Sequence, residues 1–568
     1  MKRLLLLLVA PIVAAIGLSA QDRLFRSDDI PNVSFRHTFN VVEATIPDMQ
    51  AALASGRVTS RELVLLYMSR IAQYEDLINA TAYVSRTALE EAELLDEERA
   101  RGRVRGPLHG IPVAVKDIIN TTNMPTTGGA LILEGFVPRF EAPLVTSLKA
   151  AGAVIIAKTT LTELANWVTN GMPANYSALF LYAMNPYDPR PDPRAGTNDG
   201  RPLLSTGGSS SGTGTAANFW AASVGTETSG SILSPSSANM LVGIKPTVGL
   251  ISRWGIIPIT ADQDTAGPMT RTVEDAAILL GGMTGVDPND PATTTCQPGI
   301  DYRRHLLRSG LRGARIGIPR ANYYVATTRP DTGATVGPSM NAAQVALMEE
   351  AMQILRNEGA TIVDPANIPS ILDRTPANSF LTWPTCAGLG NRRGMDAACS
   401  ITFKYGMKRD YTAWSNASGA PSLTQMRNYN LANRPRNAIR YEQENLDISD
   451  EMDVVADRAR WQADRNRDVF ISRTHGIDEI LARENLDALL TGANSFAAIA
   501  AKAGLPTITV PFGLLASTAT NLPAGFNARP GPYGASFTGG ACTEGRLIEI
   551  AYAFEQATRR RIPPFSTP

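Results

Sequence analysis

The chain has 568 residues, of which 44% are hydrophobic and 19% charged, and its 53 Lys and Arg residues balance its 53 Asp and Glu residues. This composition is ordinary for a globular enzyme, and the zero net charge argues against nucleic acid or an anionic membrane surface as a partner. On length alone the chain would be divided among several domains.

The N-terminal segment indicates export. Two basic residues precede an apolar run over 4–18, and Leu-Ser-Ala at 18–20 offers a small-residue cleavage site. This pattern is typical of a secretory signal peptide, and the run is shorter than the ~20 residues that span a bilayer. We therefore predict a signal peptide over 1–20. The mature chain, 21–568, is expected to be periplasmic or secreted, without stable membrane insertion after the signal is removed.

The remaining chain alternates strands with helices. Residues 42–100 are helical in pattern. Short apolar runs then predict strands, and amphipathic segments predict helices between them. The predicted strands are 111–115, 153–157, 314–319, 360–363, 486–490 and 506–511, and the predicted helices are 144–151, 341–357 and 545–558. This alternation predicts an α/β layered fold with a largely buried sheet. Residues 375–475 lack the alternation, are polar and mostly helical in propensity, and are predicted to cap a pocket.

Cysteine and histidine are scarce. Export would permit disulfides, and Cys386 and Cys399 are close enough in sequence to pair. Cys296 and Cys542 complete a pattern too sparse to decide between disulfides and free thiols. With only four histidines and no Cys/His cluster, we expect no metal and no cofactor.

The segment 207–235 carries the strongest chemical signal. Two turns rich in glycine and hydroxyl side chains flank an Ala-rich stretch. Glycines let backbone N–H groups converge on one point, while a serine hydroxyl can act as a nucleophile. This combination suits acyl transfer, in which one serine attacks and nearby N–H groups hold the oxyanion.

A lysine is the candidate base for such a serine. No Gly-x-Ser-x-Gly elbow supports a Ser-His-Asp triad, whereas burial can lower the pKa of a lysine enough to leave a neutral amine. Lys116 ends an apolar strand and is the favoured candidate. Lys158 has Thr159, Thr160 and Glu163 as ordinary structural partners, and Lys245 lies at a turn; a structural role stays open for all three lysines.

Six motifs, in chain order, resemble those of the amidase signature family. They are Pro112–Asp117, Gly207–Gly212, Gly225–Ile232, Gly243–Thr247, Gln263–Met269 and Gly504–Pro511. The resemblance covers nearly the whole mature chain. It implies one three-layer α/β/α domain around a large mixed sheet, in place of several domains.

The resemblance also implies a Ser-cisSer-Lys triad. Lys116 would be the base, Ser209 a relay that follows a cis peptide bond, and Ser231 the nucleophile that forms an acyl-enzyme. Asp264 matches a supporting position near the nucleophile. The oxyanion would be held by the backbone N–H groups of Thr228, Ser229, Gly230 and Ser231.

Two features depart from the family pattern. Ser229 stands where many members have glycine, and Leu233 stands where many have arginine. The form Thr-Glu-Thr-x-Gly-Ser, which this chain has at 226–231, is similar to that of peptide-amidase-like members. Ser209 and Ser231 are 22 positions apart, two fewer than is usual in the family. We expect a helix over 212–222, with a flanking loop absorbing the difference.

The leading hypothesis is a serine-dependent amide hydrolase, monomeric or homodimeric, that acts on small or peptidyl carboxamides. A catalytically impaired binding protein of the same fold is one alternative. An amidotransferase-type subunit is another, but its cytoplasmic partners fit poorly with a signal peptide.

Overall fold

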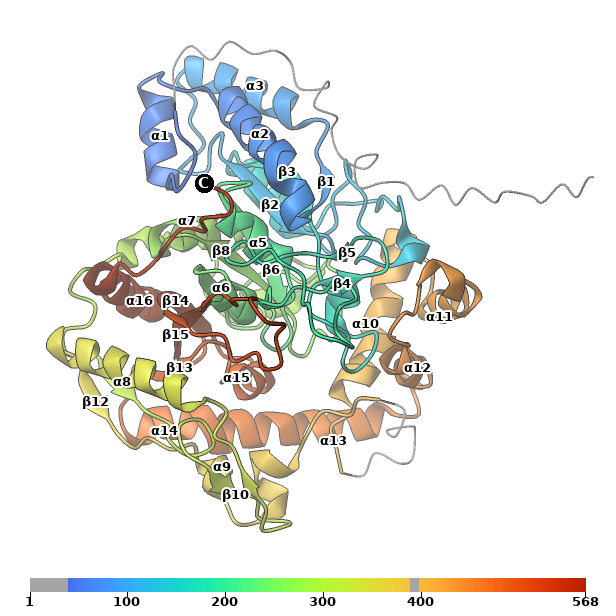
Figure 1. Ribbon diagram of the computed structural model, residues 1–568, viewed down its shortest axis with the longest axis vertical. Helices are drawn as coiled ribbons and strands as arrows, with labels where there is room; N and C mark the ends of the chain where they lie inside the picture. The colour runs from blue at the N-terminus through green and yellow to red at the C-terminus, as the bar shows by residue number, and fades with distance from the viewer. Residues whose placement is uncertain (1–38, 389–397) are drawn as a thin grey trace, which may run out of the picture.

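The computed structural model describes residues 39–388 and 398–568, so the predicted signal peptide lies outside the described residues (Figure 1). At its centre is an 11-stranded sheet in the order β1-β3-β2-β6-β8-β7-β14-β15-β13-β9-β12. Its strands are β1 (Thr81–Val84), β2 (Pro112–Lys116), β3 (Val154–Thr159), β6 (Ala222–Glu227), β7 (Val242–Lys245), β8 (Thr265–Thr270), β9 (Arg315–Gly317), β12 (Thr361–Val363), β13 (Ala488–Gly492), β14 (Thr507–Leu515) and β15 (Gly531–Thr538).

The sheet is mixed. Strand β2 runs parallel to both β3 and β6, whereas β6 is antiparallel to β8, and β14 is antiparallel to β7 and β15. Two small hairpins lie outside it: β4 (Tyr176–Ser177) with β5 (Leu181–Tyr182), and β10 (Thr327–Thr328) with β11 (Thr335–Val336). The predicted α/β fold with one large mixed sheet is confirmed.

Helices cover both faces of the sheet (Figure 1). Helices α5 (Ser210–Ala216) and α6 (Leu233–Ala238) contact each other and pack on the strands from β2 to β15. On the other face α4 (Pro143–Ala150), α7 (Val273–Met283) and α16 (Glu544–Thr558) form a continuous layer. The N-terminal helices are α1 (Ile46–Ala54), α2 (Ser60–Ile78) and α3 (Ala88–Ala100), and α8 (Ala342–Asn357) packs near β12 to β14.

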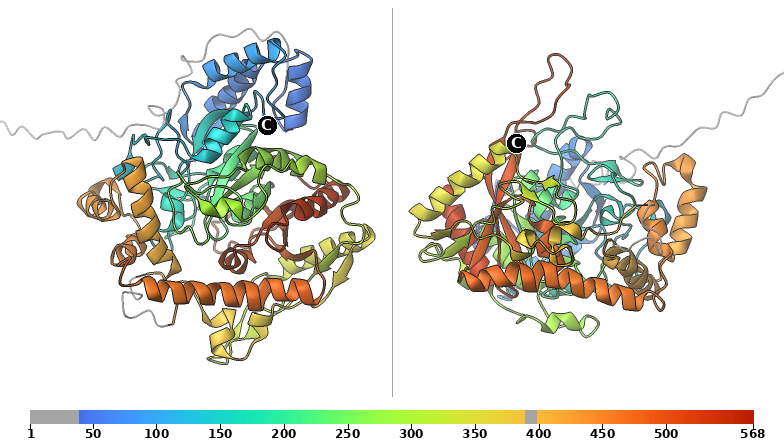
Figure 2. Two further views of the ribbon diagram at one scale, coloured as in Figure 1. Left: turned by 180° about the vertical axis from the view of Figure 1, so that it is seen from behind. Right: turned by 90° about the horizontal axis from the view of Figure 1, so that it is seen from below.

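The described residues between β12 and β14 are mainly helical, apart from β13. They form α9 (Pro369–Leu372), α10 (Thr402–Ser418), α11 (Leu423–Ala432), α12 (Glu444–Asp450), α13 (Arg458–Val469), a π-helix (Phe470–Ile477), α14 (Asp478–Arg483) and α15 (Ala497–Ala503). Figure 2 shows α13 continuing into the π-helix as one long rod along the edge of the molecule. Buried Asp468 ties this rod to its surroundings, because its carboxylate accepts from Lys502 Nζ at 2.5 Å and from Trp383 Nε1 at 3.0 Å.

The helix expected over 212–222 is wrong in extent. Helix α5 ends at Ala216, Asn218 has a left-handed φ of 58°, and β6 already begins at Ala222. The Trp220 ring lies so close to Gly214 that a Cβ there would be 2.2 Å from it, and its Nε1 donates to Thr215 Oγ1 at 2.7 Å. A short helix and a tight turn therefore connect the two serine turns.

All four cysteines are paired, as Cys296–Cys542 and Cys386–Cys399. The first joins segments 246 positions apart, and the second closes a loop of 13 positions. Across residues 39–388 and 398–568, every helix is too short or too polar to span a membrane.

Candidate active site

Strand β2 carries Lys116 into the protein interior. Its Nζ donates to Thr226 Oγ1 at 3.0 Å and to Thr226 O at 3.5 Å, both on the neighbouring β6. Burial lowers the pKa of Lys116 to about 8, against the opposing effect of the Asp264 and Glu227 carboxylates. No ion pair is formed by Lys116 within the described residues, so a neutral amine is accessible near neutral pH.

The other two candidate lysines are held by structural contacts. Lys158 Nζ donates to Ile119 O at 2.6 Å and to Thr126 Oγ1 at 2.9 Å, and its ion pair with Asp117 spans 3.5 Å. Lys245 Nζ donates to Leu505 O at 2.5 Å. Burial lowers the pKa of both lysines to about 8 as well. Their contacts, more than their pKa values, separate them from Lys116.

The first serine turn is built by two glycines. Gly207 and Gly208 have φ values of 77° and 96°, which favour glycine, and Ser209 then caps α5. Ser209 is buried, and its Oγ accepts from Ser211 N at 3.4 Å. Thr162 Oγ1 donates to Gly208 O at 3.1 Å and holds the turn against the end of β3.

The cis peptide bond implied before Ser209 is not what the structure contains. Among the described residues the cis bonds precede Pro338 and Pro365, and the Gly208–Ser209 bond is trans. The two left-handed glycines already reverse the chain, and Ser209 pairs in extended conformation with Leu161. The backbone thus reaches α5 without a cis bond.

Ser231 lies in the turn between β6 and α6 and is partly exposed. Glu227, at the end of β6, accepts through Oε2 from the N–H groups of Ile232 at 2.9 Å and Leu233 at 3.0 Å. By contrast, the N–H groups of Ser229, Gly230 and Ser231 have no acceptor in the described part of the chain. Three consecutive amides beside a serine hydroxyl are an arrangement that can hold an oxyanion.

The N–H group of Thr228, the fourth amide of the predicted set, also has no acceptor in the described residues, but the Thr228 hydroxyl and carbonyl are both hydrogen-bonded. The hydroxyl donates to Asp264, and the carbonyl accepts from Gln263 Nε2 at 3.1 Å. Asp264 also accepts from the N–H groups of Ile259 and Thr260, each at 3.0 Å. Burial raises the pKa of Asp264 to about 7, although the hydrogen bond from Thr228 opposes this. Asp264 therefore connects the turn that contains Ser231 to the loop between β7 and β8.

The two serine turns meet at one cavity. A Cβ on Gly207 would lie 2.4 Å from Pro235 Cα, so the first turn packs directly on the start of α6. A cavity of about 200 Å³ is lined by residues of both turns, including Gly208 and Ser231. No hydrogen bond joins Lys116, Ser209 and Ser231 to one another in the described residues. The two serine turns thus share one cavity, but the side chains of Lys116, Ser209 and Ser231 are not linked as a relay.

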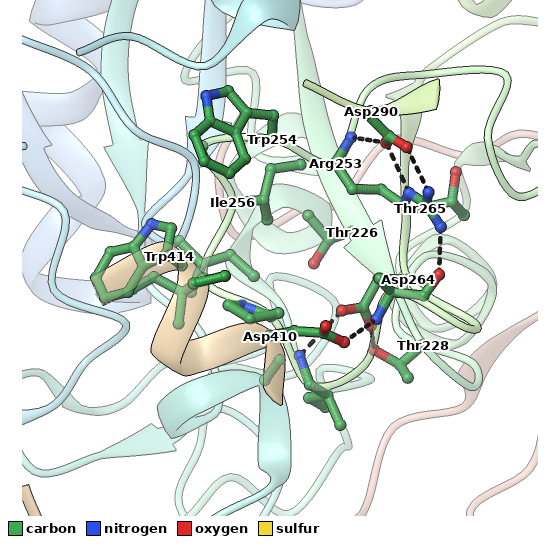
Figure 3. Close-up of a pocket in the computed structure, with 18 of the residues that line it drawn as sticks. Thr226, Thr228, Arg253, Trp254, Ile256, Asp264, Thr265, Asp290, Asp410 and Trp414 are labelled. Atoms are coloured by element: carbon green, nitrogen blue, oxygen red, sulfur yellow. Dashed lines mark hydrogen bonds and ion pairs between the residues drawn. The ribbon is translucent and has the colours of Figure 1, made fainter. Parts of the chain in front are cut away.

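A second cavity, of about 270 Å³, adjoins the first, and both are lined by Ala165. Thr226 and Thr228 line it from β6 and its end, Trp254 and Ile256 from the loop between β7 and β8, and the helical segment α10 contributes Trp414 (Figure 3). Neither Thr226 nor the two tryptophans were predicted from the sequence as site residues. Thr226 lies inside the Gly225–Ile232 motif, which is the signal that could have indicated it.

Comparison with known proteins decides the family. The family model described as Amidase matches residues 62–548. The chain belongs to the amidase signature family. It is 33% identical over 568 residues to an Arabidopsis thaliana protein named "probable amidase", with 99% of this chain and 97% of that protein covered.

Solved structures agree with this membership. The native peptide amidase from Stenotrophomonas maltophilia has a TM-score of 0.76 and 34% identity, covering 94% of this chain and 100% of its own. An amidase family protein from Bacillus anthracis has a TM-score of 0.75 and 29% identity, covering 92% of each chain. This member of the amidase signature family is an amide hydrolase.

The family also includes relatives with a different role. One of them, from the glutamyl-tRNA(Gln) amidotransferase of Chloroflexus aurantiacus, is 37% identical over 323 residues, which is 56% of this chain and 60% of that relative. In sequence, the similarity to the probable amidase extends over 99% of this chain, against 56% for the amidotransferase component.

Proposed function

We propose that the protein hydrolyses small or peptidyl carboxamides through Lys116, Ser209 and Ser231. One observation carries this proposal: a buried lysine without an ion-pair partner in the described chain donates to Thr226, on the strand that leads into the turn of a partly exposed serine, and the backbone amides before that serine have no acceptor there. Neutral Lys116 takes a proton from Ser209, and Ser209 takes one from Ser231. Ser231 Oγ then attacks the amide carbonyl, and the carbonyl oxygen accepts from the N–H groups of residues 229–231.

The acyl-enzyme completes the reaction. The relay returns the proton to the departing nitrogen, the C–N bond breaks, and water then cleaves the Ser231 ester to release the acid. The relay needs Ser209 Oγ to exchange its present contact with Ser211 N for contacts with Lys116 and Ser231. That contact is 3.4 Å long, beyond the usual range of N–H···O bonds, so its loss costs little.

The disulfides and the structural relatives of the chain support an exported enzyme that acts on peptidyl amides. Both disulfides consume all four cysteines, a use of cysteine that suits an oxidising compartment. The peptide amidase relative matches 94% of this chain, which supports a peptide C-terminal amide as one substrate. An exported protein would lack the cytoplasmic partners of an amidotransferase subunit.

The test is removal of the nucleophile. Ser231→Ala should abolish hydrolysis of an aryl amide and of a peptide C-terminal amide, whereas Lys116→Ala should reduce kcat/KM by several orders of magnitude. Ser236→Ala is the matched control, because the Ser236 hydroxyl is buried on α6 without a partner among the described residues. Its activity should stay at the wild-type level.

A fluorophosphonate separates the enzyme from a binding protein of the same fold. Wild-type protein should be labelled at Ser231, and Ser231→Ala should not. Hydrolysis retained by Ser231→Ala would refute the triad. Folded wild-type protein that neither labels nor cleaves any amide would favour the catalytically impaired alternative.

A further inference from the structure

The 270 Å³ cavity has an apolar wall assembled from two distant segments. Trp254 and Ile256 come from the loop between β7 and β8, and Trp414 comes from α10 (Figure 3). An apolar cavity of about 150 Å³ is large enough to bind benzene. This cavity can therefore hold a phenyl group with its linker, or a larger fused ring.

Neighbouring groups hold both tryptophans in place. Trp254 stacks on Phe140, with ring centroids 5.5 Å apart and planes inclined by 21°. Trp414 is buried, and its Nε1 donates to Asn120 Oδ1 at 3.1 Å. Because these rings are already ordered, a ligand entering the cavity loses little free energy to ordering its walls.

The charged groups of the lining disfavour an anionic ligand. Asp264, Asp290 and Asp410 line the cavity, and Arg253 is the one cation among its described lining residues. Arg253 is committed to Asp290, with Nε to Oδ2 at 2.7 Å. No uncommitted cation of the described lining is left to receive a carboxylate, which would instead face Asp264 and Asp410.

The position of the cavity relates it to the reacting bond. Thr226, which binds Lys116 Nζ, and Thr228, which precedes the amides of the nucleophile turn, both line it. Ala165 separates it from the cavity into which Ser231 opens. A group placed there lies one short linker away from a carbonyl at Ser231.

We propose that this cavity is the subsite for the acyl side of the substrate and selects a neutral, ring-bearing acyl group over small aliphatic and anionic ones. The inference rests on the proposed carboxamide hydrolysis, because a primary amide releases only ammonia and its bulk therefore lies on the acyl side. Suitable substrates are primary amides with an aromatic ring two or three bonds from the carbonyl.

The first experiment compares 3-phenylpropanamide, propanamide and succinamate. The phenyl compound should have a kcat/KM about 10- to 100-fold above that of propanamide, as expected for burial of one ring. Succinamate should be the poorest of the three. Equal kcat/KM values for all three would overturn the inference.

A helix-surface substitution tests the location. Ala413 lies on α10, is exposed and lines the cavity, so Ala413→Phe should fill the cavity without disturbing the core. The preference for 3-phenylpropanamide over propanamide should fall about tenfold. Thr412→Phe is the matched control, because Thr412 is exposed on the same turn but outside the lining; it should keep the wild-type preference. An unchanged preference in Ala413→Phe would overturn the assignment.

A binding measurement distinguishes failure of the inference from failure of the proposed function. In Ser231→Ala, 3-phenylpropanamide should quench tryptophan fluorescence, and adding Ala413→Phe should weaken its binding about tenfold. If no amide is hydrolysed but this binding difference is present, the subsite stands and the hydrolytic proposal fails. If amides are hydrolysed and the binding is unchanged by Ala413→Phe, the subsite is refuted and the hydrolytic proposal stands.

Discussion

The pH dependence of kcat/KM gives the sharpest test of Lys116 as the base. With a pKa near 8, about a tenth of the Lys116 side chains are neutral at pH 7 and about nine-tenths at pH 9. For a neutral amide substrate, kcat/KM should therefore rise about tenfold between these values, because kcat/KM reports groups of the free enzyme.

Asp264→Asn separates Lys116 from its neighbour. The pKa of Asp264 is also raised, to about 7, by burial, so the two groups titrate in the same range. The Asp264 carboxylate raises the pKa of Lys116, and its removal should move the rising limb to lower pH. The assay is initial rate at substrate far below KM and constant ionic strength.

Three outcomes of that assay would differ in meaning. A limb that moves to lower pH supports Lys116 as the titrating base. A limb that disappears in Asp264→Asn would assign the titration to Asp264. A wild-type profile that is flat from pH 6.5 to 9 would refute the reasoning that burial leaves Lys116 partly neutral.

Three further predictions concern stability. Burial raises the pKa of Glu75 to about 8, so the wild type loses folding stability as pH rises from 4.5 to 8. The free energy of unfolding of Glu75→Gln, measured by urea denaturation, should therefore increase relative to that of the wild type by about 1.4 kcal/mol per pH unit over this range. An equal difference between the two proteins at pH 5 and pH 8 would contradict this. Cys542→Ser should cost about 2–5 kcal/mol and exceed the loss in Cys399→Ser, because its disulfide closes the longer loop; equal losses of thermal stability would count against the loop argument. Asp468→Asn leaves buried Lys502 unpaired and should cost about 3–5 kcal/mol, whereas a loss below 1 kcal/mol would show that the pair is not needed.

The sequence predicted strands where apolar residues run together. Strand β2 and strand β3 are buried along their whole length and consist mainly of Val, Ile and Ala, which is the pattern of a strand inside a parallel sheet. Strands β6, β7 and β8 were not predicted, although they lie at the centre of the same sheet. Strand β15 was not predicted either, nor was β1, which lies inside the segment 42–100 that the pattern predicted to be helical. Strands β6 and β8 are rich in Gly, Thr and Ser, and the short β7 is interrupted by Gly243, so their burial comes from the helices that cover them.

Part of the candidate site could likewise be predicted from the sequence and part could not. Lys116, Ser209 and Ser231 could be predicted from sequence motifs, because Lys116 ends an apolar run and both serines lie in glycine-rich turns. The apolar wall of the 270 Å³ cavity could not be predicted in this way. Trp254 and Trp414 are brought together only by the packing of α10 over the loop between β7 and β8. The trans bond before Ser209 was not predicted either. It goes with the left-handed conformation of Gly207 and Gly208 and with the β-bridge between Ser209 and Leu161.

Glu227 determines which backbone amides of the turn around Ser231 are already hydrogen-bonded. Five amides follow one another from Ser229 to Leu233, and the Glu227 carboxylate takes the last two. An oxyanion formed at Ser231 under the proposed function would therefore be held by the amides before Ile232, next to the Ser231 hydroxyl, and not by those at the start of α6. Because the Glu227 carboxylate already occupies the amides of Ile232 and Leu233, the proposed mechanism predicts that the position of the oxyanion along the chain is determined before substrate binds.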